Sequence, residues 1–254
     1  MTNSDNDKLM NQMKNHPAKT LQAEVNTFRK TLSLICIQNR IILTSYLNKT
    51  QNPDHFLPMA DLKSENKRSY ETGEILRLLS NYLSSVKSVI DHSRRISNNI
   101  FELPLANNFK TEITQYKKDL ECFAQLDLSV FVNCLRNYIQ HYGIPEPTLT
   151  IKFGQAKDDK TEFEGGYIFQ ASSLYPWNGW KQKAKQFLSD NENINLLDVV
   201  IKYSNEFEPL NLQLLKILSL IIKPLKDEYN KLVSEFLKKY PPITPDQIKN
   251  AVKP

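Results

Sequence analysis

Glycine and cysteine are scarce in this chain of 254 residues. Its six glycines are too few for the tight turns of an all-β fold or for a glycine-rich phosphate loop. Its three cysteines, Cys36, Cys122 and Cys134, lie in apolar stretches and lack the Cys-x-x-Cys pairing of a zinc or redox site. We therefore expect a mainly helical protein whose cysteines are reduced core residues.

Long apolar runs are also missing. The N-terminal sequence MTNSDNDKLMNQMKNH has no apolar segment of the kind that begins a secretory signal. The most apolar stretch, residues 210–225, is interrupted by lysines and by Pro224, well before the roughly 18 apolar residues of a membrane span. These features predict a cytoplasmic protein with no membrane partner. The net charge of +5 mildly favours an anionic partner without indicating one.

Apolar residues recur at helical spacing through most of residues 18–145. They predict a long helix from about Leu21 to Tyr46, a second from about Ile75 to Ile90, and a third from Phe109 to Phe123. A fourth helix is expected over 128–142, capped by Asp127 or Ser129 and closed by Gly143 and Pro145. Residues 51–70, rich in charge and proline, are expected to connect the first two helices.

From Thr148 the spacing changes to alternation, which predicts a β-hairpin ending in GGYIFQA. Two further helical segments are expected over 195–203 and 210–240. The predicted organisation is a flexible tail over 1–17, a helical bundle over 18–145, and a hairpin with additional C-terminal helices over 146–254, packed on the bundle as one unit. The fold class is mainly α.

The fourth predicted helix contains Arg136 and, five positions later, His141. A guanidinium can hold a phosphate through two hydrogen bonds, and an imidazole can move a proton at neutral pH, so the pair suits phosphoryl transfer. Five residues turn through about 140° on a helix, so the two side chains diverge unless the helix end distorts or a second subunit completes the site. The alternative is a solvated Arg136 and a His141 that interacts with the helix dipole.

The sequence CLRNYIQHYGIP resembles the R-x(4–6)-H motif of the HEPN superfamily, in which a polar residue such as Asn137 follows the arginine. The order of the helices over about 18–145 is also similar to the helical bundle of that family. The resemblance implies a metal-independent endoribonuclease, without cofactor, that leaves 2′,3′-cyclic phosphate ends. It implies that His141 transfers protons, that Arg136 binds the scissile phosphate and stabilises the transition state, and that Asn137 orients it or His141 by hydrogen bonding. It further implies a homodimer and a role in a toxin–antitoxin or antiphage defence system, with an antitoxin or regulatory protein as a possible partner.

Further residues are candidates for substrate binding. Their positions at the end of the second helix and directly after the motif place them near the expected cleft; they are Asp91, His92, Arg94, Arg95 and Tyr142. The alternative for the first four is a salt bridge at a helix end. Tyr175, Trp177 and Trp180 either stack on bases or form a small core under a turn.

Two hypotheses of different classes follow. The first is a dimeric HEPN-type ribonuclease acting on RNA. The second is a non-catalytic helical module that binds RNA, a nucleotide or a protein partner without consuming it.

Overall fold

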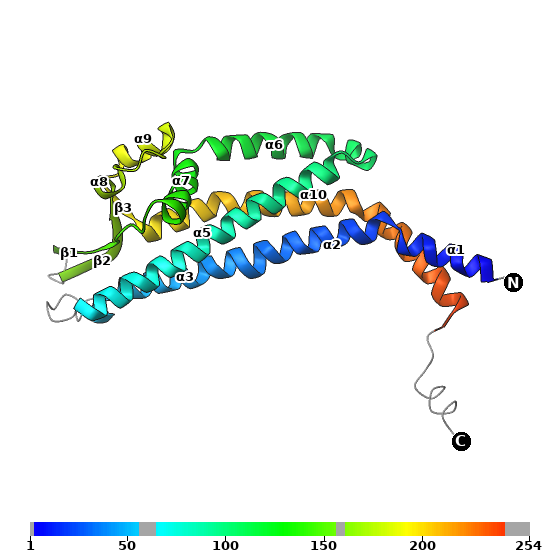
Figure 1. Cartoon of the computed structure of the whole chain (residues 1–254), viewed down its shortest axis with the longest axis horizontal. Coiled ribbons are helices and arrows are strands. Elements are labelled where there is room, and N and C mark those ends of the chain that lie inside the picture. The colour runs from blue at the N-terminus through cyan, green and yellow to red at the C-terminus, as the bar shows by residue number, and fades with distance from the viewer. Residues whose placement is uncertain (1–2, 56–64, 156–160, 242–254) are drawn as a thin grey trace, which may run out of the picture.

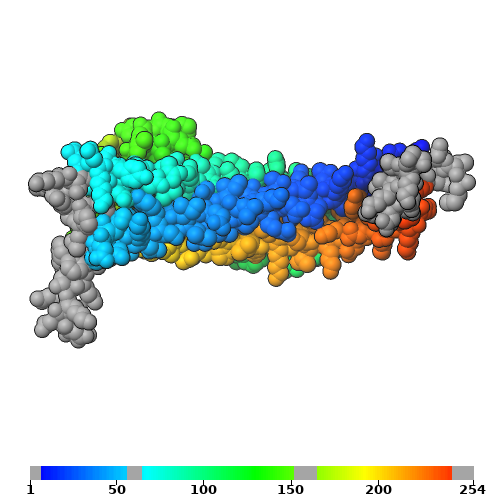
Figure 2. Space-filling model, turned by 90° about the horizontal axis from the view of Figure 1, so that it is seen from below, coloured from blue at the N-terminus to red at the C-terminus, as the bar shows by residue number. Residues whose placement is uncertain are grey.

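The computed structural model describes residues 3–55, 65–155 and 161–241, and in it three long helical segments run side by side (Figures 1 and 2). The first segment joins α2 (Pro17–Lys30), the π-helical η1 (Thr31–Ile37) and α3 (Gln38–Thr50). The second is α5 (Glu65–Phe101) and the third is α10 (Leu196–Lys239). The mainly helical fold class predicted from the sequence is confirmed, as are the first and second predicted helices. The connection predicted over 51–70 is wrong at its end, because α5 already begins at Glu65; residues 56–64 lie outside the described residues.

The C-terminal helix differs from the prediction. The sequence predicted separate helices over 195–203 and 210–240, whereas α10 is one helix that continues through both Pro209 and Pro224. Each proline removes a backbone donor and disfavours a helix. Apolar side chains on both sides of Pro209, among them Phe207, Leu210 and Leu214, are buried in the core, and this packing outweighs the local preference.

The predicted flexible tail is also helical. Residues Asn3–Lys14 form α1, which contacts α10 and buries Leu9. His16 begins α2 as its N-cap, and its Nδ1 accepts a hydrogen bond from the Ala18 amide at 3.2 Å. The polar composition of the tail concealed this structure because its apolar partner surface lies on a distant part of the chain.

Two shorter helices pack on the long ones: α6 (Lys110–Gln125), preceded by the 3₁₀-helix η3 (Pro104–Phe109), and α7 (Asp127–His141). Figure 1 shows α6 running along the long helices and α7 crossing them. They confirm the third and fourth predicted helices. The predicted side-chain cap is wrong, because the N-cap of α7 is Leu126, which makes no side-chain hydrogen bond. Cys36 and Cys134 are buried as expected, but Cys122 on α6 is exposed.

A small antiparallel sheet closes one end of the molecule. Strands β1 (Thr148–Gln155) and β2 (Thr161–Gln170) form the predicted hairpin. A three-residue strand that the sequence did not predict, β3 (Asn193–Asn195), pairs with the end of β2. Along the chain, α8 (Ala171–Leu174) and α9 (Gln182–Asp190) come between β2 and β3, and α9 packs on α7.

One cluster of buried apolar side chains extends from Val25 on α2 to Ile222 on α10 and includes Phe169 of the sheet. The residues predicted as a bundle and those predicted as a hairpin with C-terminal helices therefore share a core. Within the described part of the chain, no helix is long and apolar enough to span a bilayer.

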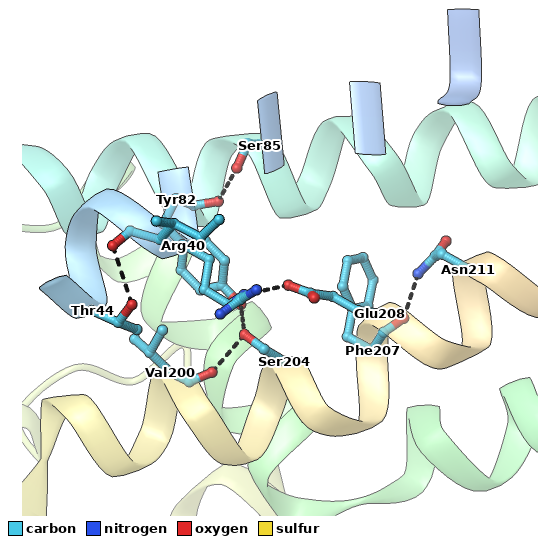
Figure 3. Close-up of polar contacts among 10 residues, drawn as sticks. Arg40, Thr44, Tyr82, Ser85, Val200, Ser204, Phe207, Glu208 and Asn211 are labelled. Atoms are coloured by element: carbon cyan, nitrogen blue, oxygen red, sulfur yellow. Dashed lines mark hydrogen bonds and ion pairs between the residues drawn. The ribbon is translucent and has the colours of Figure 1, made fainter. Parts of the chain in front are cut away.

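Polar side chains cross this core where the three long segments meet (Figure 3). The Tyr82 hydroxyl on α5 and the Ser204 hydroxyl on α10 are 2.8 Å apart, and Ser204 donates to the Val200 carbonyl at 2.6 Å. Nearby, the Arg40 Nε on α3 donates to the Glu208 carboxylate at 2.5 Å. We call these four side chains, Arg40, Tyr82, Ser204 and Glu208, the central network. Because both of its side-chain pairs join two different long segments, the network fixes their relative register.

Candidate functional site

The face of α7 that packs on α9 is aromatic. The Phe131 ring stacks on Phe187 at 4.5 Å and on Trp180 at 5.7 Å between ring centroids. The Tyr138 ring, two turns further along α7, stacks on the other side of this cluster at 5.7 Å from Trp180. This packing anchors α7 and directs its opposite face towards α5, α6 and α10.

Trp180 is expected either to stack on a base or to form a small core under a turn, and the structure shows the second. Its side chain is 4% exposed, and its Nε1 donates to the Leu174 carbonyl at 2.7 Å. Trp180 is thus a core residue under a turn and is not available to stack on a base. Trp177 is partly buried against the Tyr138 ring, whereas Tyr175 remains exposed.

A cavity of about 730 Å³ lies between α5, α6, α7 and α10. From α7 it is lined by Ser129, Asn133, Arg136 and Asn137. These positions are separated by three or four residues or are adjacent, so they occupy one face of the helix. Arg136 and Asn137, two of the three residues of the motif, therefore open into the same cavity.

Positive charge and aromatic rings dominate the wall of this cavity. Its cationic residues are Lys87, Arg94, Lys117, Arg136 and Lys181, and Glu102 is the one carboxylate among its described lining residues. Its aromatic residues are Phe101, Tyr116, Phe123 and Phe207. A wall of this composition suits a ligand that has both an anionic group and a flat apolar part.

Two polar atoms of the cavity wall are buried without a hydrogen-bond partner in the described structure: the Ser129 Oγ and the Arg136 Nε. The Arg136 Nη1 donates to the Asn137 Oδ1 at 3.2 Å, so the guanidinium is oriented by its neighbour while its Nε stays unpaired. An unpaired buried polar group costs about 1–3 kcal/mol. A ligand that bonds to both atoms would recover that cost.

His141 is the last residue of α7 and does not line the cavity. It is exposed and makes no hydrogen bond or ion pair with the described residues. Tyr142, which follows it, is 54% exposed, and its ring packs against Tyr138 and Trp177. One chain therefore leaves His141 outside the cavity that Arg136 enters, as the helical spacing predicted.

The candidates on α5 separate into two groups. Arg94 lines the cavity, whereas His92 faces the first helical segment, where its Nδ1 lies 3.0 Å from the Thr31 Oγ1. Arg95 is exposed and does not line the cavity. Two residues along a helix turn through about 200°, which explains why Arg94 and His92 point to opposite sides.

Asp91 lies in a salt bridge, as the alternative predicted, but not at a helix end, because α5 continues to Phe101. Its carboxylate lies 2.5 Å from the Lys87 ammonium and 4.0 Å from the Arg94 guanidinium, so it belongs to a salt bridge at the surface of α5. Of the five residues predicted as candidates for substrate binding, Arg94 alone lines the cavity with Arg136.

Sequence reasoning missed several residues of the cavity. The sequence predicts Ser129 only as a helix cap, although its spacing of seven from Arg136 places both residues on one helix face. Lys117 and Lys181 come from α6 and from the residue before α9, and no pattern in the sequence links them to the motif.

The part of the chain that the structure describes contains no cluster of side chains that could bind a metal ion. No three side chains among its histidines, cysteines, aspartates and glutamates are placed to hold one ion. The site is therefore described by hydrogen bonding and charge alone.

No family model, curated protein or solved structure matches this chain. The resemblance to HEPN proteins depends on the motif from Arg136 to His141 and on the order of the helices. Function is accordingly argued from the chemistry of the site.

Proposed function

We propose that the protein is a metal-independent endoribonuclease of the HEPN type that acts as a homodimer in the cytoplasm. The observation that carries the proposal is the arrangement on α7. Arg136 is held by Asn137 with an unpaired Nε in a cationic cavity, and His141 is exposed at the end of the same helix.

Each residue has a role in this reaction. The 2′-hydroxyl of the RNA attacks the adjacent phosphorus, the bond from phosphorus to the 5′-oxygen breaks, and a 2′,3′-cyclic phosphate remains. Arg136 binds the phosphate and stabilises its developing charge, and Asn137 orients the guanidinium. His141 takes part in the proton transfer from the 2′-hydroxyl to the leaving oxygen.

A second copy of the chain resolves the divergence of the two side chains. His141 is followed by Tyr142, 54% exposed, and by Ile144, 70% exposed, which provide apolar surface around the helix end. In an isologous dimer each surface meets its own copy, so the His141 of one subunit can approach the phosphate held by the Arg136 of the other. The proposed biological setting, a toxin–antitoxin or antiphage system with a regulatory partner, follows from the family resemblance.

The test is incubation of purified protein with mixed cellular RNA in EDTA, followed by analysis of the fragment ends. We expect cyclic phosphate ends from the wild type and at least a hundredfold slower cutting by His141→Ala and Arg136→Ala. Arg95→Ala is the matched control, because Arg95 is an exposed arginine outside the cavity. The proposal fails if both motif variants cut RNA as fast as this control.

Dimer formation is tested separately by mixing the two inactive variants. If each site combines residues from two chains, heterodimers of Arg136→Ala and His141→Ala contain one site with both residues intact. Mixing should then restore part of the activity. Variants that stay inactive when mixed, with dimers demonstrated by light scattering, would show that each site belongs to one chain.

A second function, non-catalytic binding, is favoured by one observation: the cavity lies on the side of α7 that His141 does not face. A binding module predicts that RNA is bound and recovered intact, and that Arg136→Ala lowers affinity. Wild-type protein that binds RNA in EDTA without cutting it would favour this function over the ribonuclease.

A further inference from the structure

We propose that the cavity beside α7 is a binding site for one nucleotide unit, with the base inside and the phosphate at Arg136. That this nucleotide unit belongs to an RNA strand rests on the proposed function. The same chemistry also describes a free nucleotide, and the experiment below separates the two sources.

The inner wall of the cavity is aromatic. The Phe101 and Tyr116 rings meet edge to face at 6.2 Å between centroids, and the Phe123 and Phe207 rings are 5.9 Å apart. Tyr116 and Phe207 are each 2% exposed, so these two rings are packed among protein side chains, and Phe101, which is only partly buried, is the ring that a ligand can contact. The Phe101 ring lines the cavity and offers a flat apolar surface, on which a base can stack without one particular sequence being required.

The polar groups of the interior suit the edge of a base. The Ser129 side chain is 1% exposed, lines the cavity, and its Oγ has no partner in the described structure. A hydroxyl both donates and accepts, which matches the neighbouring donors and acceptors on a base edge. An alkyl chain would leave this hydroxyl unpaired, so the interior favours a base over a lipid tail.

Charge at the cavity suits a phosphate. The Arg136 Nε is buried and unpaired, and Arg94 and Lys181 line the same cavity. Arg94 is only loosely neutralised, since its distance to the Asp91 carboxylate is 4.0 Å. The volume of about 730 Å³ falls within the roughly 300–1,000 Å³ that small-molecule sites occupy, so a base, its sugar and one phosphate fit together.

The experiment is calorimetric titration of the His141→Ala protein, which removes the proposed proton-transfer residue and keeps the cavity. The ligands are the four ribonucleoside monophosphates, ribose 5-phosphate and inorganic phosphate. We expect at least one monophosphate to bind ten times or more tighter than ribose 5-phosphate. Ser129→Ala in this background should weaken the monophosphate about fivefold and leave ribose 5-phosphate unchanged. Arg136→Gln should weaken both, and Arg95→Gln neither.

Short oligonucleotides identify the source of the nucleotide. An RNA trinucleotide that competes with the monophosphate, and that loses affinity when its central base is removed, shows that the unit belongs to a strand. A monophosphate that binds without competition from any trinucleotide identifies a free nucleotide; the nucleotide site then stands and its RNA source is rejected.

Equal binding of ribose 5-phosphate and of every monophosphate would overturn the inference, as would a Ser129→Ala variant that is folded and binds as the parent does. These outcomes are independent of cleavage. Wild-type protein that cuts RNA but shows no base-dependent binding keeps the ribonuclease and rejects the nucleotide site. Base-dependent binding without any cutting of RNA keeps the nucleotide site and rejects the ribonuclease.

Discussion

The central network and the cavity beside α7 use the same two long helices, α5 and α10, but treat buried polar groups in opposite ways. In the central network the Tyr82 and Ser204 hydroxyls pair at 2.8 Å, and Arg40 pairs with Glu208 at 2.5 Å (Figure 3). In the cavity the Ser129 Oγ and the Arg136 Nε have no partner among the described residues.

This contrast separates a structural role from a ligand-binding one. A fully paired polar network stabilises one packing arrangement of the helices, whereas an unpaired buried group is retained at a cost in stability that function can explain. Tyr203 lies between the two regions and is an exception. Its hydroxyl is buried without a partner, its ring packs on Phe123 and Phe207, and burial raises its pKa well above the ordinary value.

Breaking the ion pair of the central network should have the largest effect on stability. Glu208→Ala leaves the Arg40 guanidinium, whose side chain is 26% exposed, without its partner. We expect the free energy of unfolding to fall by about 2–3 kcal/mol, somewhat less than for a fully buried pair. Chemical denaturation measures this loss.

Glu74→Ala is the control for Glu208→Ala, because Glu74 pairs with Arg77 on the exposed surface of α5. Its denaturation midpoint should remain that of the wild type. Equal losses in the two variants would show that the Arg40–Glu208 pair contributes no more than a surface pair.

Removing one hydroxyl from the central network should have an intermediate effect. Tyr82→Phe keeps the ring but leaves the Ser204 hydroxyl without its partner on α5. The expected loss is about 1 kcal/mol, the usual net contribution of a buried hydrogen bond. Thermal unfolding followed by circular dichroism would measure it, and an unchanged melting temperature would contradict the role given to this bond.

Removing one hydroxyl from the cavity should have a smaller effect of the opposite sign. Ser129→Ala deletes an unpaired buried group and introduces a better helix former into α7. We expect stability to stay the same or to rise by about 0.5 kcal/mol. A loss as large as that of Tyr82→Phe would indicate that Ser129 has a structural partner, and would remove the contrast between the two regions.

The smallest effect is expected from alkylation of the native protein. Cys122 is exposed and should react, whereas Cys36 is fully buried beside the central network, where burial raises its pKa to about 12. Mass spectrometry after iodoacetamide treatment should find one modified site, with no change in melting temperature. Rapid modification of Cys36 under native conditions would show that the core around the network opens.

Within the site, the sequence supplied the divergence of Arg136 and His141, because it depends only on the geometry of one helix. It did not separate Arg94 from His92 and Arg95. All three lie within four residues on α5, and their roles depend on which side of α5 faces α7.

The sequence by itself determined the hairpin and the helices of residues 18–145, since periodic apolar residues form these elements wherever they are placed. Only the tertiary structure decided that α1 folds onto α10, that α10 continues through two prolines, and that Ser129 and Arg136 share a cavity with side chains of three other helices. The reason is that local spacing fixes which residues share a face of an element. Distant segments fix what that face meets, and the burial of apolar surface against them outweighs local preferences.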